Sequence, residues 1–235
     1  MLSIIIPTLN EEKYLPLLLE SIKKQNIKNY EIILADNNSK DKTRQIAKKY
    51  KCKVVKGGFP SKARNQGAKF AKGELLFFLD ADVLLTKDFL KIALKEFKER
   101  ELDLTTSRFY PIKGNIIDKL AHHIANLFMI ISEKIKPFGP GFCILIKREV
   151  HEKIKGFDET LVLAEDHDYL ERASKVGKFR ILKNTKLLIS TRRFKKDGRW
   201  NTYIKYIKVT LKLLKGKKIR KEDNVKYDFG KYNEF

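Results

Sequence analysis

Two acidic residues, Asp80 and Asp82, have the spacing needed to act on one ligand. They follow an apolar run, Leu75–Leu79, which predicts a buried strand. In an extended chain, residues two apart point the same way, so both carboxylates can face one group. Carboxylate oxygens suit Mg²⁺ or Mn²⁺, which typically takes one or two carboxylates plus substrate phosphates. The pair therefore predicts a divalent-metal site, although two acids after a strand also form turns or helix caps.

A second acidic cluster lies further along the chain, at residues 165–168. Acids at the start of a helix interact favourably with the helix dipole, which is the ordinary reason for such a cluster. A carboxylate at this position can also be a general base that takes the proton of an incoming hydroxyl. Asp166 and Glu165 are the candidates for that base.

The elements that must position these acids follow from the apolar pattern of the first half. The predicted strands are Leu2–Pro7, Glu31–Ala35, Lys53–Lys56 and Leu75–Leu79, with helical patterns between them. Runs with little polar alternation, separated by helices, indicate an α/β fold with a mostly parallel sheet covered on both faces. Ligands of such sheets bind at the carboxyl ends of the strands, so the loops that follow should converge.

The second half is predicted to be less regular. Its predicted elements are strands at Asp103–Tyr110, Phe142–Ile146, Phe179–Leu182 and Leu187–Ser190, and helices at Ile116–Ile131, from Glu165 and at Trp200–Leu214. Asn10, Ser61 and Thr86 stand where side chains cap helices, and Gly73 stands where a helix ends.

Two polar loops follow the first two predicted strands and lie where a nucleotide could bind. Their candidate ligand-binding residues are Pro7, Thr8, Asn10, Glu11 and Asp36. Asp36 can accept hydrogen bonds from a base edge, although such loops also make ordinary turns. Arg64 and Asn65 lie in the first turn of the helix after Ser61, from which they can reach phosphates or ribose.

Taken together, these residues resemble family-2 glycosyltransferases, which are inverting enzymes with the Rossmann-like GT-A fold. The resemblance covers about residues 2–195 and rests on the order and spacing of six segments. These segments are residues 3–11, 36–39, 63–67, 80–82, 156–159 and 165–166.

The resemblance implies a catalytic domain over residues 1–195, followed by a basic helical extension over residues 196–235. It implies transfer of a sugar, with inversion, from a nucleoside-diphosphate donor to an acceptor hydroxyl. A UDP-sugar is the expected donor and Mg²⁺ or Mn²⁺ the expected cofactor. The basic tail and the net charge, rather than the resemblance, suggest a lipid-linked or cell-surface glycan as the acceptor.

The resemblance also implies roles for individual residues. Pro7, Glu11 and Asp36 would line the nucleoside pocket, with Arg64 nearby. Asp80 would contact ribose or metal, and Asp82 would bind the metal. Asp166 would be the base.

The sequence departs from the family pattern in two places. Members of the family often have a second acid after the residue equivalent to Asp36. Here Asn37 stands at that position, which leaves the identity of the nucleotide base open. Processive members carry Gln-x-x-Arg-Trp, and the nearest equivalent is Arg192-Arg193-Phe194. Arg192 or Arg193 is a candidate for binding the donor diphosphate.

The charge balance is strongly basic, with 51 Lys and Arg against 29 Asp and Glu and a net charge of +22. Such a field attracts polyanions, including anionic lipid headgroups and phosphorylated ligands, but it also suits a well-solvated surface. The predicted helix at Trp200–Leu214 has an apolar face beside Lys205, Lys208, Lys212 and Lys215. It is expected either to contact an anionic membrane or to pack on the catalytic domain.

The expected location is the cytoplasm, with peripheral contact at the inner face of the cell membrane. Leu2–Ile6 is too short for a signal peptide and is followed by acids, and no apolar run approaches the length of a spanning helix. Cys52 and Cys143 are too few and too far apart for a disulfide framework or a zinc site.

Three other functions stay open. A nucleic-acid-binding protein would use the basic charge, but the sequence has no recognisable zinc-finger, RNP or GXXG signature, and its acids would repel phosphates. A nucleotidyltransferase usually has a glycine-rich or lysine-bearing phosphate loop near the first strand, which residues 7–12 do not offer. A degenerate sugar-nucleotide-binding protein would have lost acids that are intact here.

Overall fold

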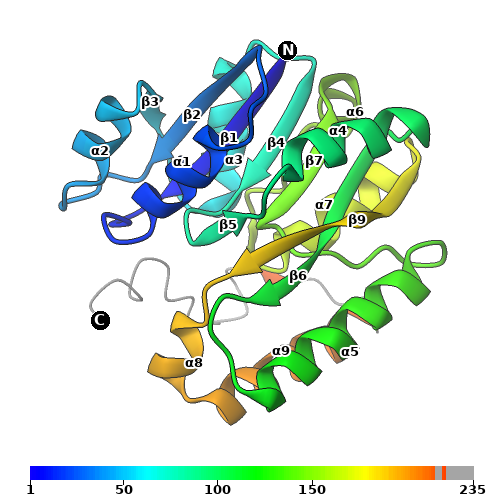
Figure 1. Cartoon of the computed structure of the whole chain (residues 1–235). Helices are drawn as coiled ribbons and strands as arrows, with labels where there is room; N and C mark the ends of the chain where they lie inside the picture. Colours follow the sequence, from blue (N-terminus) through cyan, green and yellow to red (C-terminus); the bar gives the residue numbers. More distant parts are fainter. Residues whose placement is uncertain (215–218, 221–235) are drawn as a thin grey trace.

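The computed structural model describes residues 1–214 and 219–220, which form one large mixed sheet, a small two-stranded sheet and the helices around them (Figure 1). The strands are β1 Leu2–Thr8, β2 Tyr30–Asp36, β3 Lys53–Lys56, β4 Leu75–Leu79, β5 Val83–Leu85, β6 Leu104–Pro111, β7 Cys143–Lys147, β8 Leu161–Leu163, β9 Phe179–Ile189 and β10 Ile219–Arg220. The helices are α1 Leu15–Lys23, α2 Thr43–Lys49, α3 Pro60–Phe70, α4 Phe89–Glu99, α5 Ile116–Ser132, α6 Arg148–Lys153, α7 Glu165–Ser174, α8 Arg192–Asp197 and α9 Arg199–Leu214. None of these helices is long and apolar enough to cross a membrane.

The large sheet has the strand order β3-β2-β1-β4-β7-β6-β9-β5. Its first half is parallel: β1 pairs with β2 and β4, and β2 pairs with β3. β7 then runs antiparallel to both β4 and β6, while β6 and β9 are parallel. The predicted α/β architecture with a mostly parallel sheet is therefore confirmed. Because β1, β2 and β4 are parallel, their carboxyl ends meet at one edge.

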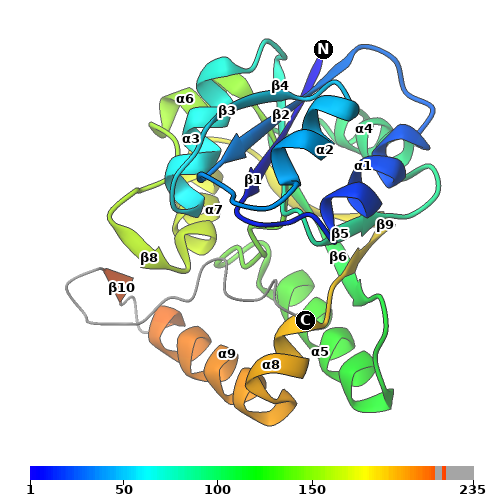
Figure 2. The same ribbon diagram turned by 90° about the vertical axis from the view of Figure 1, so that its left-hand side faces the viewer.

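Alternation along the central strands builds a core on each face of the sheet. Ile4 and Ile6 of β1 join the apolar cluster that contains α1 and α4, whereas Ile5 joins the cluster that contains α7. Figure 2 shows α1 and α4 on one side of the sheet and α3, α6 and α7 on the other. Successive strand residues point to opposite faces, so a fully apolar strand such as β1 needs helices on both sides.

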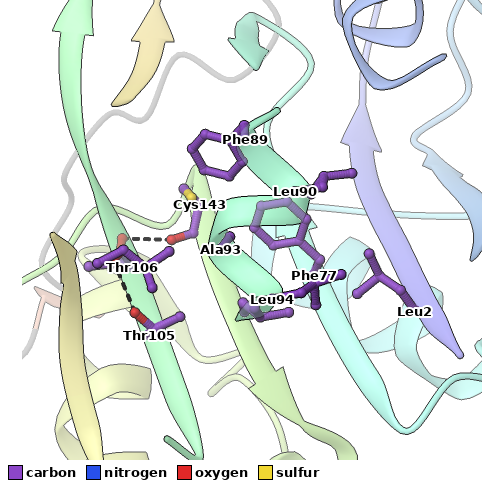
Figure 3. A pocket seen from close by; sticks show the side chains of 11 residues that line it. Leu2, Phe77, Phe89, Leu90, Ala93, Leu94, Thr105, Thr106 and Cys143 are labelled. Carbon is purple, nitrogen blue, oxygen red and sulfur yellow. Dashed lines mark hydrogen bonds between the residues drawn. The ribbon is translucent and has the colours of Figure 1, made fainter. Parts of the chain in front are cut away.

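A pocket between α4 and the sheet belongs to the first of these cores (Figure 3). Leu2, Phe77 and Phe89 line it together with other apolar side chains. Its two polar side chains are satisfied locally, because the hydroxyl of Thr106 donates to the Cys143 carbonyl at 2.6 Å and that of Thr105 donates to the Arg180 carbonyl. The pocket is therefore a packing feature of the core.

The predicted helix caps are wrong. Helices α1, α3 and α4 begin without a side-chain cap, at Leu15, Pro60 and Phe89. The hydroxyl of Thr86 instead donates to the Lys186 carbonyl, and the side chain of Asn10 binds a neighbouring loop. Gly73 lies beyond the end of α3, where an added Cβ would meet the backbone of β1.

The strand boundaries of the second half also differ from the prediction. The two short strands predicted over residues 179–190 are one strand, β9, because it pairs with β6 along most of its length despite an irregularity in register. The predicted helix at residues 200–214 is confirmed as α9, whereas Lys215 lies outside the described residues.

Helix α3 approaches β1 so closely that only a glycine fits at position 67. A Cβ added to Gly67 would overlap the Cγ2 atom of Ile5, a residue buried in the centre of the sheet. We expect Gly67→Ala to destabilise the fold by about 1–3 kcal/mol, because overpacking outweighs the helix propensity of alanine. Chemical denaturation monitored by circular dichroism measures this change.

Gly58→Ala is the matched control, because its added Cβ would meet only the flexible side chain of Lys62. The free energy of unfolding should then change by no more than about 0.5 kcal/mol. Equal stability of the two variants would contradict the close approach of α3 to β1.

Candidate active site

The carboxyl end of β2 is organised around the buried side chain of Asp36. One carboxylate oxygen accepts a hydrogen bond from the Thr8 hydroxyl at 3.1 Å, and the other accepts from the Ser39 backbone N–H at 3.0 Å. Asp36 is only 4% exposed. The predicted nucleoside-pocket residue is thus held at the sheet edge by its neighbours, beside the buried Thr8 and Pro7 at the end of β1.

The loops after β1 and β2 are joined into one unit. The side-chain oxygen of Asn10 accepts from the Lys40 N–H at 2.8 Å, and the Asn10 N–H donates to the Ser39 hydroxyl at 2.9 Å. The Glu11 N–H donates to the Thr43 hydroxyl at 2.7 Å. Asn10 has a positive φ of 55°, a conformation that asparagine tolerates better than most residues. These contacts fix the backbone on which Glu11 is carried.

Arg192 of α8 bridges two acids from different parts of the chain. Its guanidinium contacts both carboxylate oxygens of Glu11, at 2.8 and 2.9 Å, and one oxygen of Asp82 at 2.9 Å. It also lies 4.8 Å from the centre of the Tyr14 ring. The bridge connects the loop after β1, the loop after β4 and the first residue of α8.

Burial raises the pKa of Glu11 from 4.5 to about 7, against the opposing effect of Arg192 and with the help of the charges of Asp82 and Asp80. Burial also raises the pKa of Asp82, again opposed by Arg192 and supported by Asp80. The three carboxylates therefore lie close enough to repel one another. A site with this charge pattern favours additional cations.

Arg64 of α3 makes a second bridge. Its guanidinium contacts Asp80 at 2.8 Å and Glu165 at 2.8 Å, and its side chain is only 3% exposed. The pKa of Glu165 is raised by burial and by the charge of Asp166, with Arg64 opposing both. Arg64 thus ties the end of β4 to the first residue of α7, as an internal ion pair that sequence reasoning did not anticipate.

Asp166 lies beside this bridge, in the first turn of α7. One carboxylate oxygen accepts from the Gly141 N–H at 2.7 Å, and the other accepts from the His167 N–H at 2.9 Å. A Cβ at Gly141 would lie 2.8 Å from the Asp166 Cβ and 3.1 Å from the Arg64 guanidinium. The loop after α5 therefore approaches Asp166 through a glycine, and the carboxylate is oriented while remaining half-buried.

Asn65 holds a loop in this structure. Its side-chain oxygen accepts from the Phe157 N–H at 2.8 Å, and its amide donates to the Phe157 carbonyl and to Glu159 at 2.9 Å each. These contacts anchor the loop at Phe157, and the expected contact of Asn65 with phosphates or ribose stays a prediction. Gly156, with a φ of 69°, brings the loop against it.

The acids expected to hold a metal are brought together with the arginines described above. Within residues 1–214 and 219–220, no group of three or more His, Cys, Asp or Glu side chains has an arrangement that could hold an ion. Asp80 and Asp82 instead offer the two hard oxygen donors expected when a bound diphosphate supplies the rest of the shell. Arg193 lies near enough for its charge to lower the pKa of Asp82.

Comparison with known proteins connects this arrangement to sugar transfer. The family described as glycosyl transferase family 2 matches residues 3–155. The chain is 34% identical over 122 residues to the poly(ribitol-phosphate) β-N-acetylglucosaminyltransferase TarS of Staphylococcus aureus, a match that covers 48% of this chain and 21% of TarS. The chain therefore spans about a fifth of the length of that relative.

Solved structures have the same fold. A crystal structure of a TarS fragment in complex with UDP-GlcNAc superimposes with a TM-score of 0.69 at 25% identity, covering 81% of this chain and 58% of that one. The mannosyltransferase PcManGT of Pyrobaculum calidifontis, solved with GDP-Man and Mn²⁺, superimposes with a TM-score of 0.66 at 20% identity, covering 80% and 56%. The second likeness concerns the fold alone.

The Arg192 bridge predicts a stability that depends on pH. Arg192→Met leaves Glu11 and Asp82 buried without their cation, which should destabilise the fold by about 3 kcal/mol at pH 8. Loss of the arginine raises both carboxyl pKa values further, so the folded state binds more protons than the unfolded chain. The destabilisation should therefore shrink towards pH 5, as measured by urea denaturation across this pH range.

Arg44→Met is the control for the loss of an arginine near a buried acid. The Arg44 side chain is 55% exposed and lies 3.7 Å from Asp36, so its removal should change stability by about 0–1 kcal/mol. An Arg192→Met variant with the same small, pH-independent change would show that the bridge does not hold the site together.

Proposed function

Because the chain belongs to glycosyl transferase family 2, we propose that it transfers a sugar from a nucleoside-diphosphate donor to an acceptor hydroxyl. The observation that carries the proposal is the meeting of Asp80, Asp82 and Asp166 around two arginines at the carboxyl ends of β1 and β4. The complex of TarS with UDP-GlcNAc favours a UDP-sugar as the donor. The arginines support a diphosphate-bearing donor in general, since guanidinium forks bind phosphate oxygens well.

Asp80 and Asp82 are the residues that would hold a divalent cation. Their fit rests on their hard oxygen donors and on their closeness, since the charge of Asp80 adds to burial in raising the pKa of Asp82. Bound there, Mg²⁺ or Mn²⁺ would neutralise negative charge on the leaving diphosphate. Arg192 already contacts Asp82, so a bound donor would share or replace this contact, and Arg193 is proposed as a further diphosphate ligand.

Asp166 is the proposed general base. Glu165 is 12% exposed and paired with Arg64, whereas Asp166 is half-buried and oriented by two backbone N–H groups. As the acceptor oxygen forms a bond to the anomeric carbon, its proton passes to Asp166 and the bond to the diphosphate oxygen breaks. A single displacement of this kind inverts the anomeric centre. Glu165 has the separate role of positioning Arg64 against Asp80.

The acceptor is proposed to be a glycan hydroxyl. TarS is named as acting on a poly(ribitol-phosphate), and its match to this chain covers 48% of the chain. The loops carrying Gly141 and Phe157 border Asp166 and Arg64. They are the surfaces from which an acceptor would approach the base. A lipid-linked glycan fits the same chemistry, because only the hydroxyl takes part in the reaction.

Donor binding is tested by thermal unfolding with UDP-, GDP- and dTDP-sugars, each with Mn²⁺ or EDTA. We expect a UDP-sugar with Mn²⁺ to stabilise the protein by about 2.7 kcal/mol at a concentration 100 times its dissociation constant. Asp82→Asn should abolish the metal-dependent part, because the cation loses one of its two negatively charged ligands. A protein that no nucleotide sugar stabilises would contradict the proposed donor site.

The general base is tested by Asp166→Asn, which keeps the shape of the side chain and can still accept the Gly141 hydrogen bond. We expect kcat to fall by about 10²–10⁴-fold while the donor dissociation constant changes little. Release of the nucleoside diphosphate in the presence of acceptor measures kcat. Glu171→Gln, an exposed acid on the same helix, should retain full activity. An active Asp166→Asn variant would remove this residue from the reaction.

A further inference from the structure

Helix α5 buries three polar side chains against the protein, while most of its large apolar side chains face outward. Asp118, His122 and Asn126 are buried, at 1%, 5% and 3% exposure. The exposed residues on the other side are Ile116, Ile117, Leu120, Ile124, Leu127, Phe128 and Ile131. At 3.6 residues per turn these residues form one broad stripe opposite the buried polar groups. A helix on a water-exposed surface normally has the reverse arrangement.

The inward polar groups of α5 are all used. Asp118 accepts from Arg199 and from the Tyr203 hydroxyl at 2.8 Å, and it also completes the cap of its own helix with Asn115. The Asn126 amide donates to the Phe109 carbonyl at 2.8 Å and accepts from the Phe109 N–H at 3.1 Å. These contacts fix the rotation of α5, so the apolar stripe cannot turn inward.

Helix α9 lies along α5 and repeats the same feature. Arg199 and Tyr203 contact Asp118 near the start of both helices, and Lys136, just after α5, donates to the Leu213 carbonyl near the end of α9 at 2.7 Å. The exposed apolar residues of α9 are Trp200, Ile204, Ile207, Leu211 and Leu214, which recur every three or four positions. Figures 1 and 2 show both helices together at the lower end of the molecule.

We call these exposed residues of α5 and α9 the two-helix apolar face. Its members are strongly exposed, with Ile116 at 82%, Ile131 at 67% and Trp200 at 65%. Exposed apolar residues in this number on two neighbouring helices mark a contact with another hydrophobic partner. The face does not overlap the candidate active site, so what it binds does not depend on the proposed reaction.

The charges beside the face identify the partner. Lys205, Lys208 and Lys212 are exposed on α9 next to its apolar stripe, and α9 contains no acidic residue. Lys119 is exposed at the border of the stripe on α5. Lysines beside an apolar stripe with tryptophan and tyrosine are typical of helices that lie in the interface of an anionic bilayer. A second copy of the chain would bring the same lysines and no acidic residue of α9 to pair with them.

We propose that the two-helix apolar face docks in the surface of an anionic lipid bilayer, with α5 and α9 lying in the plane of the membrane. The apolar side chains enter the boundary of the acyl chains, and the lysines contact the negatively charged headgroups. The buried network around Asp118 holds the two helices in register, so that both stripes face the lipid together.

The test is co-sedimentation of the full chain with vesicles of phosphatidylcholine alone or mixed equally with phosphatidylglycerol. We expect binding to the mixed vesicles that weakens at high salt. Combining Ile124→Gln, Leu127→Gln, Ile207→Gln and Leu211→Gln should weaken binding by at least about tenfold, since four exposed apolar side chains leave the lipid. The matched control, Leu17→Gln with Phe70→Gln, changes apolar residues of similar exposure on α1 and α3 and should bind like the wild type.

Trp200 provides a second readout that needs no variant, because it is the only tryptophan of the chain and belongs to the face. Its fluorescence emission should move to shorter wavelength when mixed vesicles are added. An unchanged emission together with no sedimentation would overturn the proposal. So would a wild-type dimer that the four substitutions convert to a monomer without any vesicle binding, which would assign the face to a second copy.

Discussion

The structure depends on one electrostatic constraint: several carboxylates lie together in partly dehydrated surroundings at the ends of β1 and β4. Such a group is stable only when cations are held against it with good geometry. Arg64 and Arg192 meet this need, each joining two acids that are distant in the sequence. Those contacts connect α3, α7 and α8 to the loops after β1 and β4. The same negative charge that requires the arginines favours the binding of further cations at this place.

Much of the fold could be predicted because the strands of its parallel half are short apolar runs with clear ends. The bounds of β3 and β4 agree with the prediction, since each run ends abruptly in polar residues or glycine. The prediction of the helix caps was wrong because other parts of the fold compete for the same hydroxyl groups. The hydrogen bond from Thr86 to the Lys186 carbonyl illustrates this competition. The orientation of α5 could not be predicted either. Periodicity reveals two faces, but here hydrogen bonds to Asp118 and Asn126 decide which one is buried.

The acids of the candidate site could be found from the sequence because each follows an identifiable strand or begins a helix. The arginines that pair with these acids could not be found from the sequence, because such ion pairs form only once the sheet has assembled. Glu11 and Arg192 are separated by 181 positions, and Arg64 and Glu165 by 101. The role of a polar residue in the first turn of a helix is equally hard to predict. Arg64 and Asn65 are adjacent in α3, yet Arg64 joins two acids whereas Asn65 anchors the loop at Phe157. Only the direction of each side chain separates the two roles.

The hydrogen bonds between the loops after β1 and β2 have a consequence for how this protein can diverge. Asn10 and Glu12 each donate a backbone N–H to a side chain of the other loop, and Glu11 donates to Thr43 at the start of α2. Lys40 and Lys42 donate their N–H groups in return. An insertion or deletion in either loop would move the donors away from their acceptors and break these hydrogen bonds. The two loops are therefore expected to change length together or not at all during evolution. Grafting new specificity onto this scaffold would require exchanging both as one cassette.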